Sequence, residues 1–368
     1  MIPEMDKVAR VGSRRFPILD ALRFVLAFWV LMGHFGLPPF FAGVDQTRLV
    51  FHLIARGYSS IVWGMTAVIC FFVISGFCIH LPFRHEKKLP VARFYLRRYV
   101  RILIPVIVGV VLFRLSGNHD PLFGAKSVWW NTVLWSLLCE EIYYGIYPAT
   151  LWFVRRFGWT WLLGPAFALS LTLTLTHPYR IGWEAFGPWQ TAVILYPVWI
   201  LGCLLAEQSD RLRSRTKASE IWRWRFGVWA CAWACEILNF KTRVHFPQTM
   251  VLFGVAVYFW LKKEIALSKD EESKNAFMRL LVAGGAWSYS LYLMHLPMMT
   301  ILLRLRLPNL PPLVKWCVAT AFVLITSYIF FLAIERPSHW LARRLGRLEL
   351  RTKLAQETTP SPKPLVSA

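Results

Sequence analysis

Long blocks of apolar residues, separated by short basic segments, constrain this sequence more than any other feature. A helix that crosses a membrane needs about 20 mostly apolar residues, whereas a helix on a soluble domain keeps a polar face. The composition agrees, because 56% of the residues are hydrophobic and only 17% are charged. Soluble domains have roughly 25% charged residues. The sequence therefore predicts an all-α polytopic membrane protein and disfavours an ordinary soluble enzyme.

The apolar blocks predict about ten transmembrane helices joined by short loops. Residues 1–15 form an N-terminal segment, residues 16–337 the transmembrane domain, and residues 338–368 a basic and then Pro-rich tail. The tail is too polar to bury a core, so we expect it to be disordered. The ten ranges are 17–36, 60–81, 99–115, 128–153, 159–176, 188–206, 226–240, 246–261, 283–303 and 313–334.

The distribution of Lys and Arg predicts the orientation of these helices. If the N-terminus is inside, 31 of the 42 basic residues fall on inside segments and 9 on outside loops. Such a bias favours both termini in the cytoplasm. A net charge of +22 would suggest nucleic acid in a soluble protein. No nucleic-acid-binding motif accompanies it, so we expect contact with membrane lipid and no nucleic-acid partner.

The cysteines predict neither disulfides nor a metal site. There are seven, an odd number, and none forms a C-x-x-C pair. All lie within or beside apolar blocks, so we interpret them as buried free thiols and expect no metal.

Ionisable residues inside a span are costly and usually functional, and the first range contains three. Arg23 and His34 are 11 residues apart, which places them about 20° from a common direction and about 16 Å apart along a helix. Asp20 can pair with Arg23 one turn away. A structural histidine near a helix end is the alternative interpretation of His34.

The fourth range contains the adjacent carboxylates Glu140 and Glu141. A carboxylate inside a membrane must be paired or protonated. Placed near an imidazole, Glu140 could orient the ring and stabilise its charged form during general-base catalysis. Glu141 can instead lie at the membrane interface.

Basic side chains cluster before and within the third range, at Arg93, Arg97, Arg98 and Arg101. Spacings of three and four residues let one helical face present several guanidinium groups, whose forked geometry suits phosphate oxygens. The alternative is that this cluster only reflects the excess of basic residues in cytoplasmic loops.

Two further segments combine polar and small residues with apolar helices. In the ninth range, Ser288, Tyr292 and His295 form a polar stripe. His295 can serve catalysis directly or bond to a neighbouring helix. Ser75 and Gly76 suit close helix packing.

These groups permit acyl transfer. A histidine with a carboxylate partner can deprotonate a hydroxyl, and arginines can hold a phosphorylated carrier. A transporter or flippase that uses the buried His, Arg and Glu as a relay is the competing hypothesis.

Six segments in order across residues 16–337 resemble the acyltransferase-3 family of membrane-bound enzymes, which includes bacterial O-acetyltransferases of surface polysaccharides. None of the six is specific alone, but their order and their placement on the apolar ranges are specific together. The segments are RFPILDALRFVLAFWVLMGH, CFFVISGFCIH, FYLRRYVRILIP, LWSLLCEEIYY, WSYSLYLMH and IERP.

The resemblance implies transfer of an acyl group, above all acetyl, from acyl-CoA at the cytoplasmic side to a hydroxyl of a carbohydrate or glycolipid acceptor. It implies a multi-pass protein of the bacterial inner membrane, in the stand-alone form of the family and without a tightly bound cofactor. It also assigns His34 as catalytic base, with Arg23 as its partner and Glu140 as the fourth-range carboxylate. The substrate-binding residues that it implies are Arg97, Arg98, Arg101, Asp20, Ser75, Tyr289, Tyr292 and His295.

Overall fold

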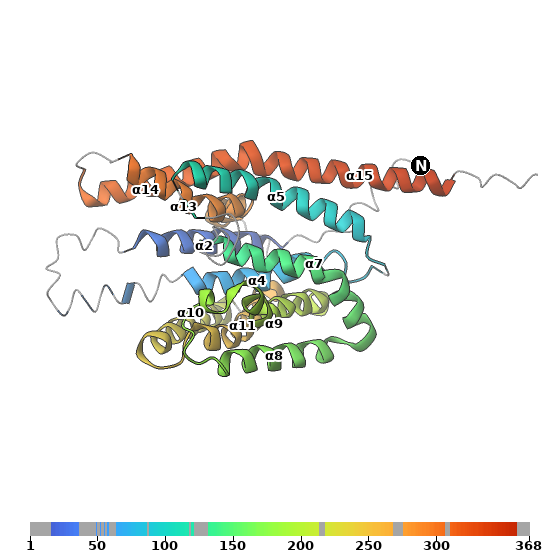
Figure 1. The fold of residues 1–368 in the computed structure, drawn as a ribbon, viewed down its shortest axis with the longest axis horizontal. Helices are drawn as coiled ribbons and strands as arrows, with labels where there is room; N and C mark the ends of the chain where they lie inside the picture. The colour runs from blue at the N-terminus through green and yellow to red at the C-terminus, as the bar shows by residue number, and fades with distance from the viewer. Residues whose placement is uncertain are drawn as a thin grey trace, which may run out of the picture.

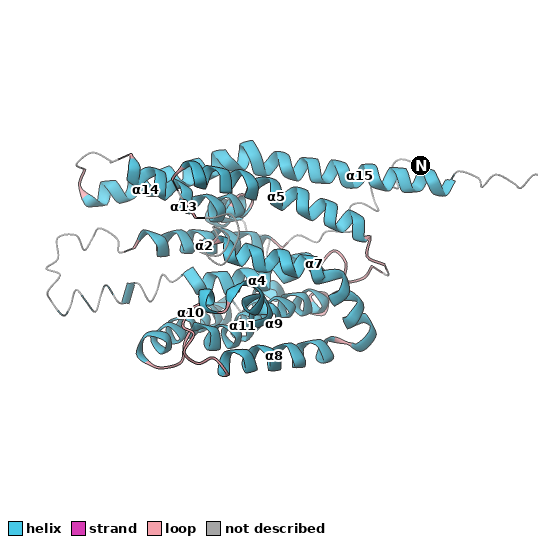
Figure 2. Ribbon diagram, viewed as in Figure 1, coloured by secondary structure: helices cyan, strands magenta, loops and turns pink. Residues whose placement is uncertain are grey.

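The computed structural model describes most of the chain, and every regular element in the described residues is helical (Figure 2). This confirms the all-α class. The described residues are 16–36, 64–86, 88–117, 119–120, 132–212, 218–267, 275–305 and 310–358, together with positions 49, 52, 55, 57 and 58.

Long α-helices account for nearly all of this structure (Figure 1). A short 3₁₀ turn, η2, covers Trp183–Ala185, and a π-helical turn, η3, covers Phe331–Glu335. The α-helices are α2 (Pro17–Phe35), α4 (Gly64–His80), α5 (Val91–Leu115), α7 (Leu134–Phe157), α8 (Trp159–Leu175), α9 (Gly187–Gln208), α10 (Ala218–Lys241), α11 (Phe246–Leu267), α12 (Ala276–Gly285), α13 (Ser288–Arg304), α14 (Pro312–Phe330) and α15 (Arg336–Thr358).

Each of the ten apolar ranges overlaps at least one of these helices. The ninth range is divided between α12 and α13, which are separated by a turn at Ala286 and Trp287. Within the described residues, three stretches are long and apolar enough to cross a membrane by length and composition: Pro17–Phe35, Gly187–Gln208 and Pro312–Arg347. The number of spans and the location of the termini stay predictions.

Helices α4 and α9 form the most closely packed pair near the centre of the molecule. A Cβ atom at Gly76 would lie 2.0 Å from the carbonyl oxygen of Trp199, and one at Gly202 would lie 2.0 Å from that of Val73. No real side chain tolerates such distances, so glycine at both positions lets the two backbones touch. The packing role predicted for Gly76 is therefore confirmed.

Helix α2 lies between α4 and α13 (Figure 1), and it also packs against α12. The contact with α12 is also a backbone contact, because a Cβ atom at Gly285 would lie 2.2 Å from the carbonyl oxygen of Asp20. This arrangement places the ionisable residues of α2 between two parts of the bundle.

Residues 336–358 form α15, whereas the sequence predicts a disordered tail from residue 338. The helix continues from α14 through the turn Phe331–Glu335 and packs along α5 (Figure 1). At Gly346 a Cβ atom would lie 2.8 Å from the side chain of Arg97. The polar composition of this segment does not reveal the surface that α5 offers it. Residues 359–368 lie outside the described part of the chain.

All seven cysteines are free, as the sequence predicts. Their burial differs from the prediction at three positions: Cys78 and Cys231 are half-buried, and Cys317 is exposed on α14.

Candidate active site

A cavity of about 470 Å³ lies among α2, α4, α5, α7, α13 and η3. Most of its wall is apolar or aromatic, from residues such as Leu19, Phe71 and Ile102. The remaining wall carries charge of both signs, with three arginines and three carboxylates. The charged residues that line the cavity are Asp20, Arg23, Arg98, Arg101, Glu140 and Glu335.

The cavity brings together most of the residues that the sequence singles out. Three predicted site residues stand apart: His34, Arg97 and His295 are described but do not line this cavity. The predicted residues that do line it are Asp20, Arg23, Ser75, Arg98, Arg101, Glu140, Tyr289 and Tyr292.

Glu140 is held by hydroxyl groups. The Tyr144 hydroxyl donates to Oε2 of Glu140 over 3.0 Å, because the two residues lie one turn apart on α7. The same hydroxyl is hydrogen-bonded to Oγ of Ser75 over 2.9 Å. The guanidinium of Arg98 lies over the Tyr144 ring, 5.9 Å from its centroid. Ser75 and Tyr144 therefore connect α4 to the carboxylate of α7.

Arg101 is held by residues that follow the last predicted span. Its Nε donates to Nε2 of His339 over 2.9 Å, and that nitrogen lies 3.4 Å from Oε1 of Glu335. Oε2 of Glu335 accepts hydrogen bonds from both the backbone N–H and the hydroxyl of Ser290. The side chain of Glu335 is 2% exposed, so these partners satisfy a carboxylate that water does not reach.

Glu335 and His339 are functional candidates that the sequence did not predict. The segment IERP contains Glu335 and was one of the six resembling segments, which was the available signal. Its location depends on the π-helical turn, which changes the angular position of the residues that follow it. Such turns occur frequently at functional sites, but no residue spacing in the sequence predicts this one.

His34 and His295 form a pair beside the cavity. Their ring centroids are 5.1 Å apart. The ring of Tyr292, which lines the cavity, lies 5.8 Å from that of His295. His34 is exposed near the end of α2, and His295 is fully buried. Tyr292 therefore connects the histidine pair to the cavity.

The two nitrogens of His295 have different surroundings. Nδ1 lies 2.6 Å from the carbonyl oxygen of Tyr292, and because a carbonyl can only accept, Nδ1 carries the proton. Nε2 is buried and has no hydrogen-bond partner among the described residues. The lone pair of Nε2 is thus available in the neutral ring.

The two tyrosines tie α13 to its neighbours. The Tyr292 hydroxyl donates to the carbonyl of Val133 over 2.8 Å and is hydrogen-bonded to Ser136 over 2.7 Å. The Tyr289 hydroxyl donates to the carbonyl of Ile102 over 3.3 Å. Both residues line the cavity and also fix its walls.

Arg97 points away from the cavity. Its side chain lies against Gly346 of α15, whereas Arg98 and Arg101 line the cavity. On a helix the direction of Arg101 lies between those of Arg97 and Arg98, which are about 100° apart, so Arg101 can line the cavity with Arg98 while Arg97 faces α15. One face of α5 therefore presents two of the three arginines together.

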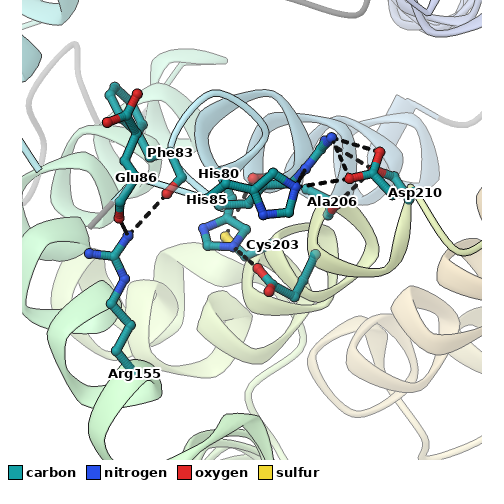
Figure 3. Close-up of polar contacts among 12 residues, drawn as sticks. His80, Phe83, His85, Glu86, Arg155, Cys203, Ala206 and Asp210 are labelled. Carbon is teal, nitrogen blue, oxygen red and sulfur yellow. Dashed lines mark hydrogen bonds and ion pairs between the residues drawn. The ribbon is translucent and has the colours of Figure 1, made fainter. Parts of the chain in front are cut away.

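A second polar cluster lies outside the cavity, at the end of α4 and in the turn that follows it (Figure 3). His80 is bonded through Nδ1 to the Tyr147 hydroxyl at 3.0 Å and through Nε2 to Glu207 at 2.9 Å. In the turn, Arg84 donates to both oxygens of Asp210 at 2.7 and 2.8 Å. His85 lies 2.9 Å from the same carboxylate.

Arg155 of α7 holds the other side of this turn. It donates to the carbonyl oxygens of Phe83 and Glu86 (Figure 3). The turn after α4 is thus fastened to both α7 and the end of α9.

Comparison with known proteins agrees with the resemblance of the six segments. The family model described as "Acyltransferase domain", acyltransferase-3, matches residues 16–332. Acyltransferase MdmB of Streptomyces mycarofaciens is 25% identical over 360 residues, covering 86% of this chain and 87% of its own length. No solved structure matches the chain significantly. Since the family model spans nearly all of the helical bundle, the chain belongs to the acyltransferase-3 family.

Proposed function

We propose that this protein is a multi-pass enzyme of the bacterial inner membrane that transfers an acyl group, above all acetyl, from acyl-CoA to a hydroxyl of a sugar or glycolipid. The observation that carries the proposal is the cavity, which combines apolar walls with Arg23, Arg98 and Arg101 in a chain of an acyltransferase family. The two halves of the cavity wall match the two parts of the donor.

Acyl-CoA contains charged phosphates and a flexible thioester arm, and we expect a different part of the cavity wall to bind each. Its phosphates suit Arg98 and Arg101, because guanidinium groups bind phosphate oxygens through paired hydrogen bonds. His339 fixes the Nε of Arg101, which leaves the outer nitrogens of that guanidinium to face the ligand. Apolar side chains along the cavity suit the flexible thioester arm.

The acceptor meets His34 at the far end of α2. Helix α2 is continuous from Pro17 to Phe35, so Arg23 and His34 are separated by about 16 Å along its axis. The thioester must therefore extend from the cavity, past Tyr292, towards the histidine pair. In this arrangement the charged end of the donor stays with the arginines while its acyl end reaches the base.

His34 removes the proton of the acceptor hydroxyl as its oxygen attacks the thioester carbonyl. A carbon–oxygen bond forms, the carbon–sulfur bond breaks, and the thiolate of CoA leaves and takes up a proton. His295 positions His34 through their ring contact. Glu140, bonded to Tyr144, balances the positive charge of Arg23 and Arg98 in the cavity.

The decisive experiment measures free thiol released from acetyl-CoA by the purified protein, with and without envelope glycans. We expect release that depends on the glycan and is lost in His34→Ala. His177→Ala is the matched control, because it removes a histidine at the end of α8, outside the cavity and the His34–His295 pair, and it should retain turnover.

The same experiment distinguishes this enzyme from the transporter of the competing hypothesis. A transporter in detergent, without a membrane gradient, would release no thiol with any donor or acceptor. Full turnover in His34→Ala would remove His34 from the mechanism.

A further inference from the structure

A second, open groove lies between α10 and α11, with a volume of about 530 Å³. It shares no residue with the cavity of the candidate active site. The side of α10 contributes residues at spacings of three and four, which form one helical face. The groove is lined by Glu220, Arg223, Trp224, Gly227, Val228 and Ala256.

The floor of the groove is apolar and contains free space. Trp224 and Val228 supply its α10 wall, and Ala256 is the α11 residue that lines it. A Cβ atom built at Gly227 would meet no other atom within 4 Å. Two small residues, Gly227 and Ala256, therefore keep an apolar space open between two packed helices.

Most charges near the groove are neutralised within the protein. Lys263 lies 3.1 Å from Glu220. Arg225 donates two hydrogen bonds, of 2.6 and 3.0 Å, to the buried carboxylate of Glu264. Arg223 is exposed and makes no ion pair with a described residue. The charge of Arg223 also acts on Glu220, so the named groups comprise three basic side chains and two carboxylates, an excess of one positive charge.

The surroundings of the groove suit the boundary between membrane and water. Among the described helices, α10 packs mainly against α11. Its outer face exposes Trp222, Phe226 and Trp233, which are 67%, 65% and 41% exposed. Residues 207–225 contain six Lys and Arg. Exposed aromatic rings next to basic residues are typical of a membrane interface on the cytoplasmic side.

We propose that this groove binds an anionic phospholipid of the membrane, with the phosphate on Arg223 and an acyl chain along Trp224, Gly227 and Val228. Basic pockets between helices on the cytoplasmic side bind anionic headgroups, and an unpaired guanidinium offers charge-assisted hydrogen bonds to phosphate. The apolar floor explains why a lipid fits better than a free anion. The site goes beyond the acyl transfer proposed above and does not depend on it.

The test measures the thermal unfolding midpoint of the full-length protein in phosphatidylcholine–detergent micelles as phosphatidylglycerol is added. A lipid that binds only the folded state raises the midpoint in a saturable manner. We expect this rise in the wild type. In Arg223→Gln the half-saturating concentration should increase about tenfold, the equivalent of 1.4 kcal/mol.

Two further variants separate the groove from general attraction. Gly227→Phe fills the open space, so it should unfold like the wild type in phosphatidylcholine but lose the saturable rise. Arg344→Gln is the matched control, because Arg344 is exposed on α15 and lies 5.2 Å from the ring centroid of Trp340. It should respond like the wild type.

Four outcomes would overturn the proposal. They are no saturable rise in the wild type, an unchanged response in Arg223→Gln, a retained response in Gly227→Phe, and an equal loss in Arg344→Gln. The last would show diffuse charge attraction in place of a site. None of these results bears on thiol release, so failure here leaves the proposed enzymatic function standing.

Discussion

Two buried histidines in this bundle differ in how completely they are bonded. His80 on α4 and His295 on α13 are 1% and 0% exposed. His80 has a partner at each ring nitrogen, Tyr147 and Glu207. His295 has a partner at Nδ1 only, and its Nε2 has none among the described residues.

The difference in hydrogen bonding distinguishes a histidine that holds helices together from one that has a nitrogen free to take part in a reaction. A buried polar atom without a partner costs about 1–3 kcal/mol, so the unpartnered Nε2 of His295 calls for an explanation. His80 completes a hydrogen-bond network between α4, α7 and α9, and both of its ring nitrogens are occupied. His295 keeps a free nitrogen 5.1 Å, ring to ring, from His34. We therefore propose that, of the two, His295 is the histidine that serves the reaction.

Replacing His295 by leucine should give the largest effect on turnover. Leucine is of similar size but cannot position His34, and general-base catalysis contributes about 10²–10⁴-fold. We expect turnover of acetyl-CoA to fall by about 10²-fold, with an unfolding midpoint close to that of the wild type because an unsatisfied atom is removed. Thiol release and thermal unfolding measure the two effects. A large loss of stability with little loss of turnover would show that His295 is structural.

His80→Leu should give the opposite result. The substitution leaves the Tyr147 hydroxyl and Glu207 without their shared partner. Water can reach Glu207, which is 39% exposed, but the buried Tyr147 hydroxyl is left unsatisfied, at a cost of about 1–3 kcal/mol. We expect a lower unfolding midpoint and unchanged turnover per folded molecule. The comparison fails if His80→Leu remains stable but loses turnover, since His80 would then serve the reaction.

The sequence predicts the helices of this fold better than the contacts between them. Apolar length and composition placed all ten ranges on helices, because burial in lipid or in a bundle both require apolar residues. They did not predict the division between α12 and α13 or the helix α15. Those features depend on contacts with α2 and α5, which composition does not contain.

The candidate site was predicted in its residue types more than in its geometry. Arg23 and Glu140 were singled out because charge inside an apolar range is costly, and Arg98 and Arg101 because their spacing presents several guanidinium groups on one helical face. The structure places all four around one cavity. The separation of His34 from Glu140 could not be predicted, because spacing within one helix says nothing of its neighbours. The location of Glu335 depends on a π-helical turn.

Glu335→Gln should have a smaller effect, on the KM for acetyl-CoA. Glutamine can still accept from Ser290 but removes the negative charge near His339 and Arg101. With Arg101 less well positioned, we expect the KM for acetyl-CoA to rise by up to about tenfold, equal to 1.4 kcal/mol, with a smaller change in kcat. Glu207→Gln is the control, because it removes a carboxylate from the His80 network outside the cavity. Equal changes in KM would contradict a positioning role for Glu335.

The turn after α4 should give the smallest effect, and it depends on pH. The hydrogen bond from His85, together with the charge of Arg84, holds the pKa of Asp210 below its ordinary value. A carboxyl group whose pKa is lowered by folding stabilises the protein above its unfolded pKa, about 3.9, and loses that contribution as the pH falls through the folded pKa. The Asp210 side chain is 42% exposed, so Asp210→Asn should lower stability at pH 7 by less than about 1 kcal/mol. The difference between wild type and variant in thermal unfolding should shrink below pH 4. If it persists at the lowest pH at which the protein folds, the ionised carboxylate is not its source, and the turn is held by its other contacts, those of Arg84 with Ser209 and of Arg155 with Phe83 and Glu86.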